Sequence, residues 1–568
     1  MAALMKETLE DLIRECVDGL VPPDFLFSIE RPADIGHGDF STNVAMVGAK
    51  RIGKNPRALA EEVVARIVAK HHPDILAATI AGPGFINFKL TKAYFVNALG
   101  EALTAGVDFG KNETLEGKKV IVEYTDPNPF KEFHIGHLMS NAVGESISRI
   151  VEASGAETRR ACYQGDVGMQ IAKALWGMKK SERSQSQNLS GLIDWLATSY
   201  SLGAMSFEKD NTAKKEITEI NKKIYDNSDP DINHLYEIGR NASLDYFETI
   251  YKRLGTEFDY YFFESKTAGF GQETVEKNIP DIFERSDGAV VYKGDEAKGL
   301  HTRVFINKEG LPTYEAKELG LSKIKYDTYP YYISIIITGN EVNDYFKVLL
   351  DAMSKVFPDL AAKTEHYSHG MLRLPSGKMS SRTGDVITAV SLIEETKAKA
   401  LTKISSEKLT NDEKHTIAEQ VAIGAIKYSI LRQASGKDII FDFEQSLSFE
   451  GDSGPYLQYT HARTRSLLAK AAGKKVSLEH MPEGDIRPLH KYLLRFPEIV
   501  LRAMREREPH FVATYLIELA REFNAFYGNT IVLDGAFDEP YKLALVEATS
   551  HIMKSGLNLL GISAPDKM

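Results

Sequence analysis

Apolar and polar positions follow the order strand, loop and helix over residues 118–155. Lys118–Tyr124 is a short apolar run rich in β-branched residues, which predicts a buried strand. The prolines of Asp126–Pro129 cannot continue it, because proline has no backbone donor. From His134 onward apolar residues recur at helical spacing, and Gly155 stands where a glycine often ends a helix. We therefore expect a helix that begins at His134.

A similar order of strand and helix patterns continues after residue 155. Thr158–Gln164 predicts a second strand, and a turn after it leads into a helix that continues to Met178. Strand, helix and strand in this order indicate a parallel, right-handed crossover. Ligands bind beyond the carboxyl ends of such strands, which is where His134 and His137 lie. Further strands are expected at Thr302–Ile306 and Pro330–Thr338.

The patterns on either side divide the chain into domains. Residues 1–105 mix helical and strand patterns, which predicts a compact α+β domain. Residues 106–390 form the α/β domain, with a helical, polar insertion at about 181–300. Residues 391–568 are nearly all helical in pattern and predict an all-α bundle. Its expected helices are Val421–Leu431, Gly454–Ala471, Ile486–Arg505, Phe511–Tyr527 and Tyr541–Leu560.

Composition adds constraints to this picture. The 568 residues are 43% hydrophobic and 26% charged, with no apolar run of membrane length and no signal peptide, so we expect a cytoplasmic protein without a membrane partner. The isolated Cys16 and Cys162 indicate neither a disulfide framework nor a zinc site. A net charge of −10 argues mildly against nucleic-acid binding, although the basic stretch Arg463–Arg507 could contact RNA.

The predicted helix start has a chemical consequence. A helix N-terminus offers free N–H groups and the positive end of a dipole, which attract phosphate. His134 and His137 share one face there, and Gly136 leaves space for a flat, anionic ligand. A nucleotide would fit, although two histidines at a helix start are also common as plain polar surface. The pattern alone leaves both interpretations open.

A second candidate lies in the loop 374–385. Gly377 and Gly384 bracket Lys378, Met379, Ser380 and Arg382 in this loop. Small residues around two cations indicate a loop that closes over a triphosphate and stabilises the charge on leaving pyrophosphate.

These two strings carry a resemblance. HIGH at 134–137, after a strand and a proline-rich loop, resembles the first signature of the class I aminoacyl-tRNA synthetases. The string MSSRTG at 379–384 resembles the arginyl form of the second signature. Ser381 stands where that signature usually has a second lysine, and in the family a lysine just before HIGH compensates. Lys131 occupies that position.

Longer strings extend the resemblance to both ends of the chain. Phe449–Ser466, Glu508–Tyr527 and residues 556–568 resemble the DALR-type anticodon-binding domain of the arginyl family. Gly38–Met46 and Ala81–Phe88 resemble its N-terminal domain, which touches the tRNA elbow. The resemblance implies a Rossmann-like, HUP-type parallel-sheet core between these domains. It also implies tRNA contacts, which we expect at exposed amides and aromatic rings: Asn87 with Phe85 and Phe88 around it, and Tyr456, Gln458 and Arg463.

An arginine pocket needs carboxylates, because they accept two hydrogen bonds from a guanidinium. Glu123, Asp126, Asn128, Tyr314 and Glu318 match the family's arginine-binding residues. The chain departs from the family elsewhere: glutamate replaces the usual aspartate at 318, and the usual glutamine and histidine are missing from 337–346, where Asn340, Glu341 and Asn343 are candidate replacements. Other departures are Glu132 for proline, Val167 for tryptophan and Lys542 for arginine.

The resemblance implies an arginine–tRNA ligase that forms arginyl-adenylate from ATP and transfers arginine to tRNA(Arg). The implied catalytic residues are His134, His137, Lys131, Lys378 and Arg382, with Gly136, Met379 and Ser380 also at ATP. Magnesium would accompany ATP without a dedicated protein site. We expect a monomer whose activation step needs tRNA. The alternatives are a cysteinyl- or glutaminyl-type synthetase, a small adenylyltransferase, and an inactive RNA-binding paralogue.

Overall fold

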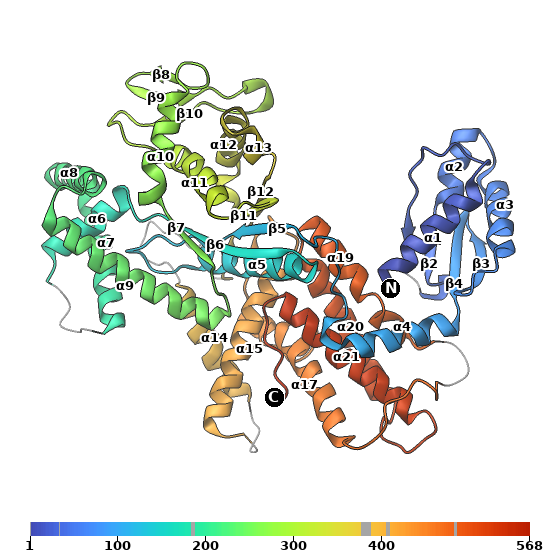
Figure 1. The fold of residues 1–568 in the computed structure, drawn as a ribbon. Coiled ribbons are helices and arrows are strands. Elements are labelled where there is room, and N and C mark those ends of the chain that lie inside the picture. Colours follow the sequence, from blue (N-terminus) through green and yellow to red (C-terminus); the bar gives the residue numbers. More distant parts are fainter. Residues whose placement is uncertain (1, 33–34, 183–187, 376–387, 405–408, 482–485) are drawn as a thin grey trace.

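The computed structural model describes residues 2–32, 35–182, 188–375, 388–404, 409–481 and 486–568 (Figure 1). Its N-terminal part contains a four-stranded antiparallel sheet in the order β1-β2-β4-β3. Helices accompany this sheet, so the predicted α+β character is confirmed. The elements are α1 (Ala2–Val17), β1 (Ile29–Glu30), β2 (Phe40–Thr42), α2 (Val44–Ile52), α3 (Pro56–Ala69), β3 (Ile75–Ala81), β4 (Phe85–Leu90) and α4 (Lys92–Ala105).

A five-stranded sheet in the order β12-β11-β5-β6-β7 forms the centre of the molecule, and all its pairings are parallel. This confirms the predicted crossover. The chain runs from β5 to one side and later returns to the other, so β5 and β11 flank the switch point where such sheets bind ligands. The elements are β5 (Lys119–Glu123), α5 (Ile135–Ala153), β6 (Glu157–Gln164), β7 (Tyr260–Phe263), β11 (Ile333–Gly339) and β12 (Thr364–His369).

The expected insertion is helical only in its first part. After α9 the chain rejoins the central sheet as β7, and a three-stranded antiparallel sheet, β10-β9-β8, follows. The prediction of helix as far as residue 300 is therefore wrong, because the β-branched and aromatic run Ala289–Tyr292 forms a buried strand. The elements are α6 (Met169–Lys180), α7 (Leu189–Lys209), α8 (Asn211–Asp226), α9 (Pro230–Leu254), α10 (Glu264–Lys277), β8 (Glu284–Ser286), β9 (Ala289–Tyr292), β10 (Arg303–Ile306), α11 (Tyr314–Thr328), α12 (Asn343–Val356) and α13 (Pro358–Ala361).

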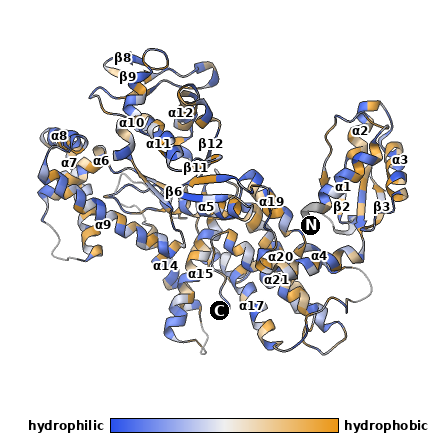
Figure 2. Ribbon diagram, in the orientation of Figure 1, coloured by the Kyte–Doolittle hydropathy of each residue, from blue (hydrophilic) through white to orange (hydrophobic). Residues whose placement is uncertain are grey.

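The C-terminal part is a helical bundle, as predicted, with hydrophobic residues along the packed helices α20 and α21 (Figure 2). One predicted helix, Ile486–Arg505, is two helices, because Pro497 lacks the N–H that a continuous helix would need. A short parallel pairing of β13 with β14 joins the bundle to the preceding part. The elements are β13 (Leu372–Arg373), α14 (Ala389–Lys403), α15 (Asn411–Leu431), β14 (Ile439–Ile440), α16 (Phe443–Ser446), α17 (Gly454–Lys470), α18 (Pro488–Leu493), α19 (Phe496–Glu506), α20 (His510–Asn529) and α21 (Glu539–Leu559).

Buried ion pairs attach the N-terminal part to this bundle. Lys491 of α18 lies 2.6 Å from Asp39, whose other oxygen accepts the backbone N–H of Leu90. Arg31 makes a two-pronged contact with Glu498 of α19. Much of the basic stretch expected to contact RNA thus pairs with acids of the protein itself. None of the described helices combines the length and the apolar character needed to cross a bilayer.

The Lys491 pair gives a stability prediction. Lys491→Met should lower the free energy of unfolding by about 3 kcal/mol or more, because Asp39 would remain buried without its cation. Urea unfolding measures the change. Lys475→Met is the matched control, since Lys475 and Glu479 are about three-quarters exposed and their pair should contribute less than about 1 kcal/mol. Equal effects of the two variants would contradict the assignment.

Candidate active site

The two predicted histidines open α5 and cap it reciprocally. His134 is the N-cap residue, and its Nδ1 accepts the backbone N–H of Gly136 at 3.1 Å. The Nδ1 of His137 accepts the backbone N–H of His134 at 3.3 Å, and the two rings stack with centroids 3.6 Å apart. Because each Nδ1 is an acceptor, each neutral ring carries its proton on Nε2. The predicted helix start is confirmed.

Burial and the nearby positive charge of Lys131 keep these rings neutral. Burial, then the Lys131 charge, lowers the pKa of His134 to about 4. Burial also lowers the pKa of His137 well below its usual value. The histidines can therefore offer neutral N–H donors to a phosphate. Gly136 has a further role here, since a Cβ at this position would lie 2.9 Å from the His134 ring.

The second signature lies outside the described residues, including Lys378, Met379, Ser380 and Arg382. The structure does describe Thr388, the first residue after 376–387. Thr388 forms an antiparallel bridge with His134, and the backbone N–H of Ala389 donates to the carbonyl of Phe133 at 2.9 Å. The chain therefore leaves this segment directly beside the first signature.

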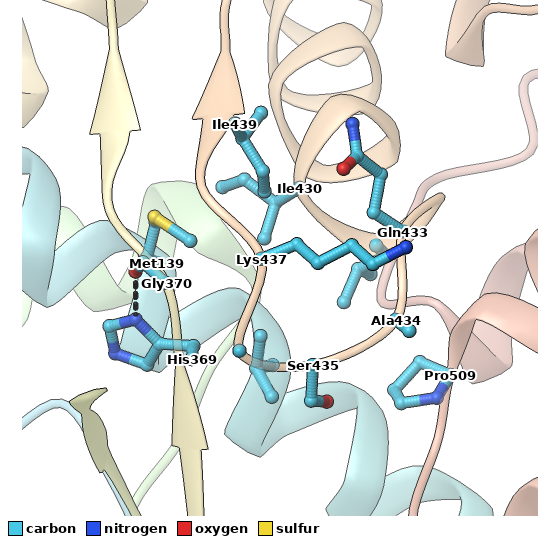
Figure 3. Close-up of a pocket in the computed structure, with 13 residues that line it drawn as sticks. Met139, His369, Gly370, Ile430, Gln433, Ala434, Ser435, Lys437, Ile439 and Pro509 are labelled. Carbon is cyan, nitrogen blue, oxygen red and sulfur yellow. Dashed lines mark hydrogen bonds between the residues drawn. The ribbon is translucent and has the colours of Figure 1, made fainter.

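A small cavity lies between α5, the end of β12 and the loop that precedes β14 (Figure 3). His369 at the end of β12 donates from Nδ1 to the carbonyl of Gly370 at 2.7 Å. A Cβ on Gly370 would lie 2.2 Å from the carbonyl oxygen of Lys437, so the loop before β14 passes directly against it. The hydroxyl of Ser435 in that loop bonds to Glu508 at 3.1 Å. The cavity thus links β12 to the C-terminal helices and contains no predicted site residue.

All the predicted arginine-binding residues line one pocket of about 490 Å³ at the switch point of the sheet. Glu123 ends β5, Asp126 and Asn128 follow it, and Tyr314 and Glu318 lie in the first turns of α11. The pocket also contains side chains from the ends of neighbouring strands and helices: Tyr163, Glu264, Arg303, Glu315, Thr338, Glu341, Tyr345 and Phe346.

Lysines pair with some of these carboxylates and leave others without a cation. Lys325 lies 2.7 Å from Glu123 and Lys317 lies 2.5 Å from Glu264, and both pairs are buried. Burial, then the charge of Glu123, raises the pKa of Asp126 and of Glu318 well above the usual values. Asp126 accepts only a backbone N–H, from Tyr163. Among the described residues, the carboxyl groups of Asp126 and Glu318 therefore form no ion pair in this pocket.

Sequence reasoning missed Glu264 and the two lysines. Glu264 directly follows β7, just as Glu123 ends β5, so the rule that sites lie at carboxyl ends of strands could have found it. Nothing local indicated that Lys317 and Lys325 would point inward. Of the replacements suggested within 337–346, Glu341 lines the pocket, whereas Asn340 and Asn343 are not among its lining residues.

The residues expected to contact tRNA differ in how far their side chains are exposed to solvent. Asn87 and Phe88 are buried, so the expected exposure is wrong for both, while Phe85 is exposed. Gln458 is also fully buried, and its Nε2 donates to two backbone carbonyls of the protein. Arg463 lies between the partly exposed rings of Tyr459 and Tyr527, at 4.7 and 5.1 Å from the ring centres. The hydroxyl of Tyr456 accepts a hydrogen bond from Asn524.

Known families match nearly the whole chain. The model "tRNA synthetases class I (R), catalytic domain" matches residues 98–443. The "DALR anticodon binding domain" matches residues 457–568, and the "Arginyl tRNA synthetase N terminal domain" matches residues 4–90.

Individual proteins agree with these matches. An arginine–tRNA ligase of Fusobacterium nucleatum is 32% identical over 99% of both chains, and one of Clostridium acetobutylicum is 31% identical over 99% of this chain and all of its own. The arginyl-tRNA synthetase structure from Thermus thermophilus has the same fold, with a TM-score of 0.81 at 24% identity over 99% of this chain and 100% of that chain. The cysteinyl, glutaminyl and adenylyltransferase alternatives are thereby excluded. The chain belongs to the arginyl-tRNA synthetase family, within the class I aminoacyl-tRNA synthetases.

Proposed function

We propose how the residues of this arginine–tRNA ligase divide the work of its reaction. The carboxylate of arginine attacks the α-phosphorus of ATP, and the bond to the β-phosphate breaks, releasing pyrophosphate. The 2′-hydroxyl of the terminal adenosine of tRNA(Arg) then attacks the activated carbonyl, and AMP leaves. We expect the protein to work as a monomer in the cytoplasm. The observation that carries the proposal is the carboxylate pocket beside the histidine-capped start of α5.

Arginine recognition is assigned to the carboxyl groups that have no paired lysine within the described ranges. Glu318 and Tyr314 would hold the guanidinium, and Asp126 with Asn128 would hold the α-amino end. Glu123 would act with them through its pair with Lys325. The pocket favours a ligand with a positive charge at both ends, because Asp126 and Glu318 are partly buried and have no ion pair among the described residues.

This assignment predicts that arginine binding depends on pH. The raised pKa of Asp126 and of Glu318 means that, before arginine binds, these two carboxyl groups keep their protons at pH values at which a carboxyl group in water would be ionised. Because arginine binds the ionised forms, it releases protons, and its affinity falls as pH falls through the raised pKa. The KM for arginine should therefore decrease as pH rises from the usual carboxyl range through the raised pKa, while the KM for ATP should not follow it.

Glu318→Gln tests whether the pH dependence of arginine binding comes from Glu318 or from another titrating group. The amide cannot ionise, so the pH dependence should flatten and the KM for arginine should rise roughly 10-fold or more. Glu309→Gln, on an exposed turn after β10, is the control and should behave like wild type. A Glu318→Gln enzyme with an unchanged KM and pH profile would contradict the assignment.

ATP activation is assigned to the helix start and the second signature. The Nε2–H groups of His134 and His137 would donate to the α-phosphate as its charge develops. Lys131 and Lys378 would neutralise the β- and γ-phosphates, with Arg382 assisting and Met379 and Ser380 in the same loop. Magnesium would enter with ATP; within the described ranges no group of His, Cys, Asp or Glu is arranged to hold a metal ion.

His134 has two roles that substitutions can separate. His134→Ala should reduce arginine activation by about 10²-fold or more, because both the helix cap and the Nε2 donor are lost. His134→Asn should restore thermal stability, since asparagine caps helices well, but not the activation rate. Pyrophosphate exchange and thermal melting measure the two roles. Full activity in the asparagine variant would reduce His134 to a capping residue.

Binding of tRNA for the transfer of arginine is assigned to exposed aromatic and basic side chains of the end domains. Arg463 with Tyr459 and Tyr527 offers stacking surfaces for unpaired bases, with Tyr456 beside them and Phe85 on the N-terminal part. We also propose that tRNA is required for activation, because β14 and the loop before it, both in the C-terminal part, contact β13 and Gly370, which precede residues 376–387.

Pyrophosphate exchange with a panel of amino acids, run with and without tRNA, tests the function. We expect exchange with arginine alone, and only when tRNA is present. Exchange with another amino acid in place of arginine would overturn the substrate assignment, and arginine exchange without tRNA would overturn only the coupling. No exchange under any condition would favour an inactive RNA-binding paralogue.

A further inference from the structure

The loop that precedes the first signature has an unusual backbone at Phe130. Its φ is +65°, a left-handed conformation that a bulky side chain rarely adopts unless its surroundings hold it there. Two contacts from α9 do so. The backbone N–H of Phe130 donates to the hydroxyl of Ser243 at 2.8 Å, and the buried ring lies against Gly239, where a Cβ would be 2.0 Å from a ring carbon. The insertion therefore fixes the residue just before Lys131.

Lys131 itself contacts another helix of the insertion. Its Nζ lies 4.9 Å from the centre of the Tyr200 ring, on α7. Tyr200 is half-buried and packs against the hydrophobic core of the insertion, so the position of its ring is set by that core. Among the described residues, Lys131 forms no ion pair, so no carboxylate competes with the ring. A cation over an aromatic face is attracted to it and still has N–H groups free to donate.

Lys131 also lies close enough to the signature histidines to affect them electrostatically. Its positive charge contributes to the lowered pKa of both His134 and His137. The α7 ring thus holds a cation beside the helix start that we assign to the α-phosphate. A lysine side chain otherwise loses considerable rotamer freedom when it binds a ligand, and confinement before binding reduces that cost.

We propose that the helical insertion positions Lys131 for the phosphates of ATP, with Tyr200 as the positioning residue and α9 as the support for the loop. The proposal rests on the function assigned above to Lys131. It gives the insertion a part in activation although, in the described structure, helices α7, α8 and α9 do not line the arginine pocket.

Substitutions at Tyr200 test the proposal through arginine-dependent pyrophosphate exchange with tRNA present. Tyr200→Leu should lower kcat/KM for ATP by about 3- to 10-fold and leave the KM for arginine unchanged, because only the cation–π contact is lost. Tyr200→Phe keeps the ring and should stay near wild type. Phe207→Leu is the matched control: it removes a ring of the same helix that lies 4.2 Å from Lys173, outside the proposed site, and should have no effect.

A double-mutant cycle with Lys131→Met distinguishes positioning from a general effect on the fold. In the Lys131→Met background Tyr200→Leu should cause no further loss, since there is no cation left to place. The same fold-loss in both backgrounds, an increase in activity, or no effect of Tyr200→Leu in the otherwise wild-type enzyme would each overturn the positioning role alone. Unchanged exchange in Lys131→Met by itself would overturn the function assigned to Lys131, and the positioning role with it.

Discussion

The reciprocal cap between His134 and His137 is the interaction on which the rest of the site depends. It fixes where α5 begins, stacks both rings and makes each Nδ1 an acceptor, so that Nε2 carries the proton. The backbone of Phe133 and His134 also meets Thr388 and Ala389, where the chain leaves residues 376–387. One helix start therefore organises the donors of the first signature and holds Thr388 and Ala389 beside them.

The pocket beside this helix start shows how a charged substrate can be selected inside a protein. A buried carboxylate is costly unless a cation compensates it, and Lys325 and Lys317 do so for Glu123 and Glu264. In the part of the chain that the structure describes, the carboxyl groups of Asp126 and Glu318 have no such partner. Under the proposed assignment, a doubly cationic ligand completes the electrostatic balance of the pocket, which ties specificity to the protonation of the pocket.

Buried polar contacts also connect the parts of the chain. Lys491 binds Asp39 of the N-terminal part, and Lys427 of α15 donates to the carbonyls of Leu254, at the end of α9, and Gly561, near the C-terminus. Burial lowers the pKa of Lys427 to about 7. Because such contacts lose their value when either side moves away, they hold the tRNA-binding ends and the catalytic sheet in a defined arrangement.

Much of this architecture could be predicted from the sequence, because it depends on local patterns. The period of apolar residues predicted β5, α5, β6 and the C-terminal helices, and long similar strings identified the family at both ends. Tertiary structure alone decided what depends on distant partners. Glu123 meets Lys325 some 200 residues later, Asn87 and Gln458 are buried rather than exposed, and Lys131 meets a ring of the insertion. Burial and pairing of a polar side chain are set by which elements the fold brings against it, and no local pattern records that.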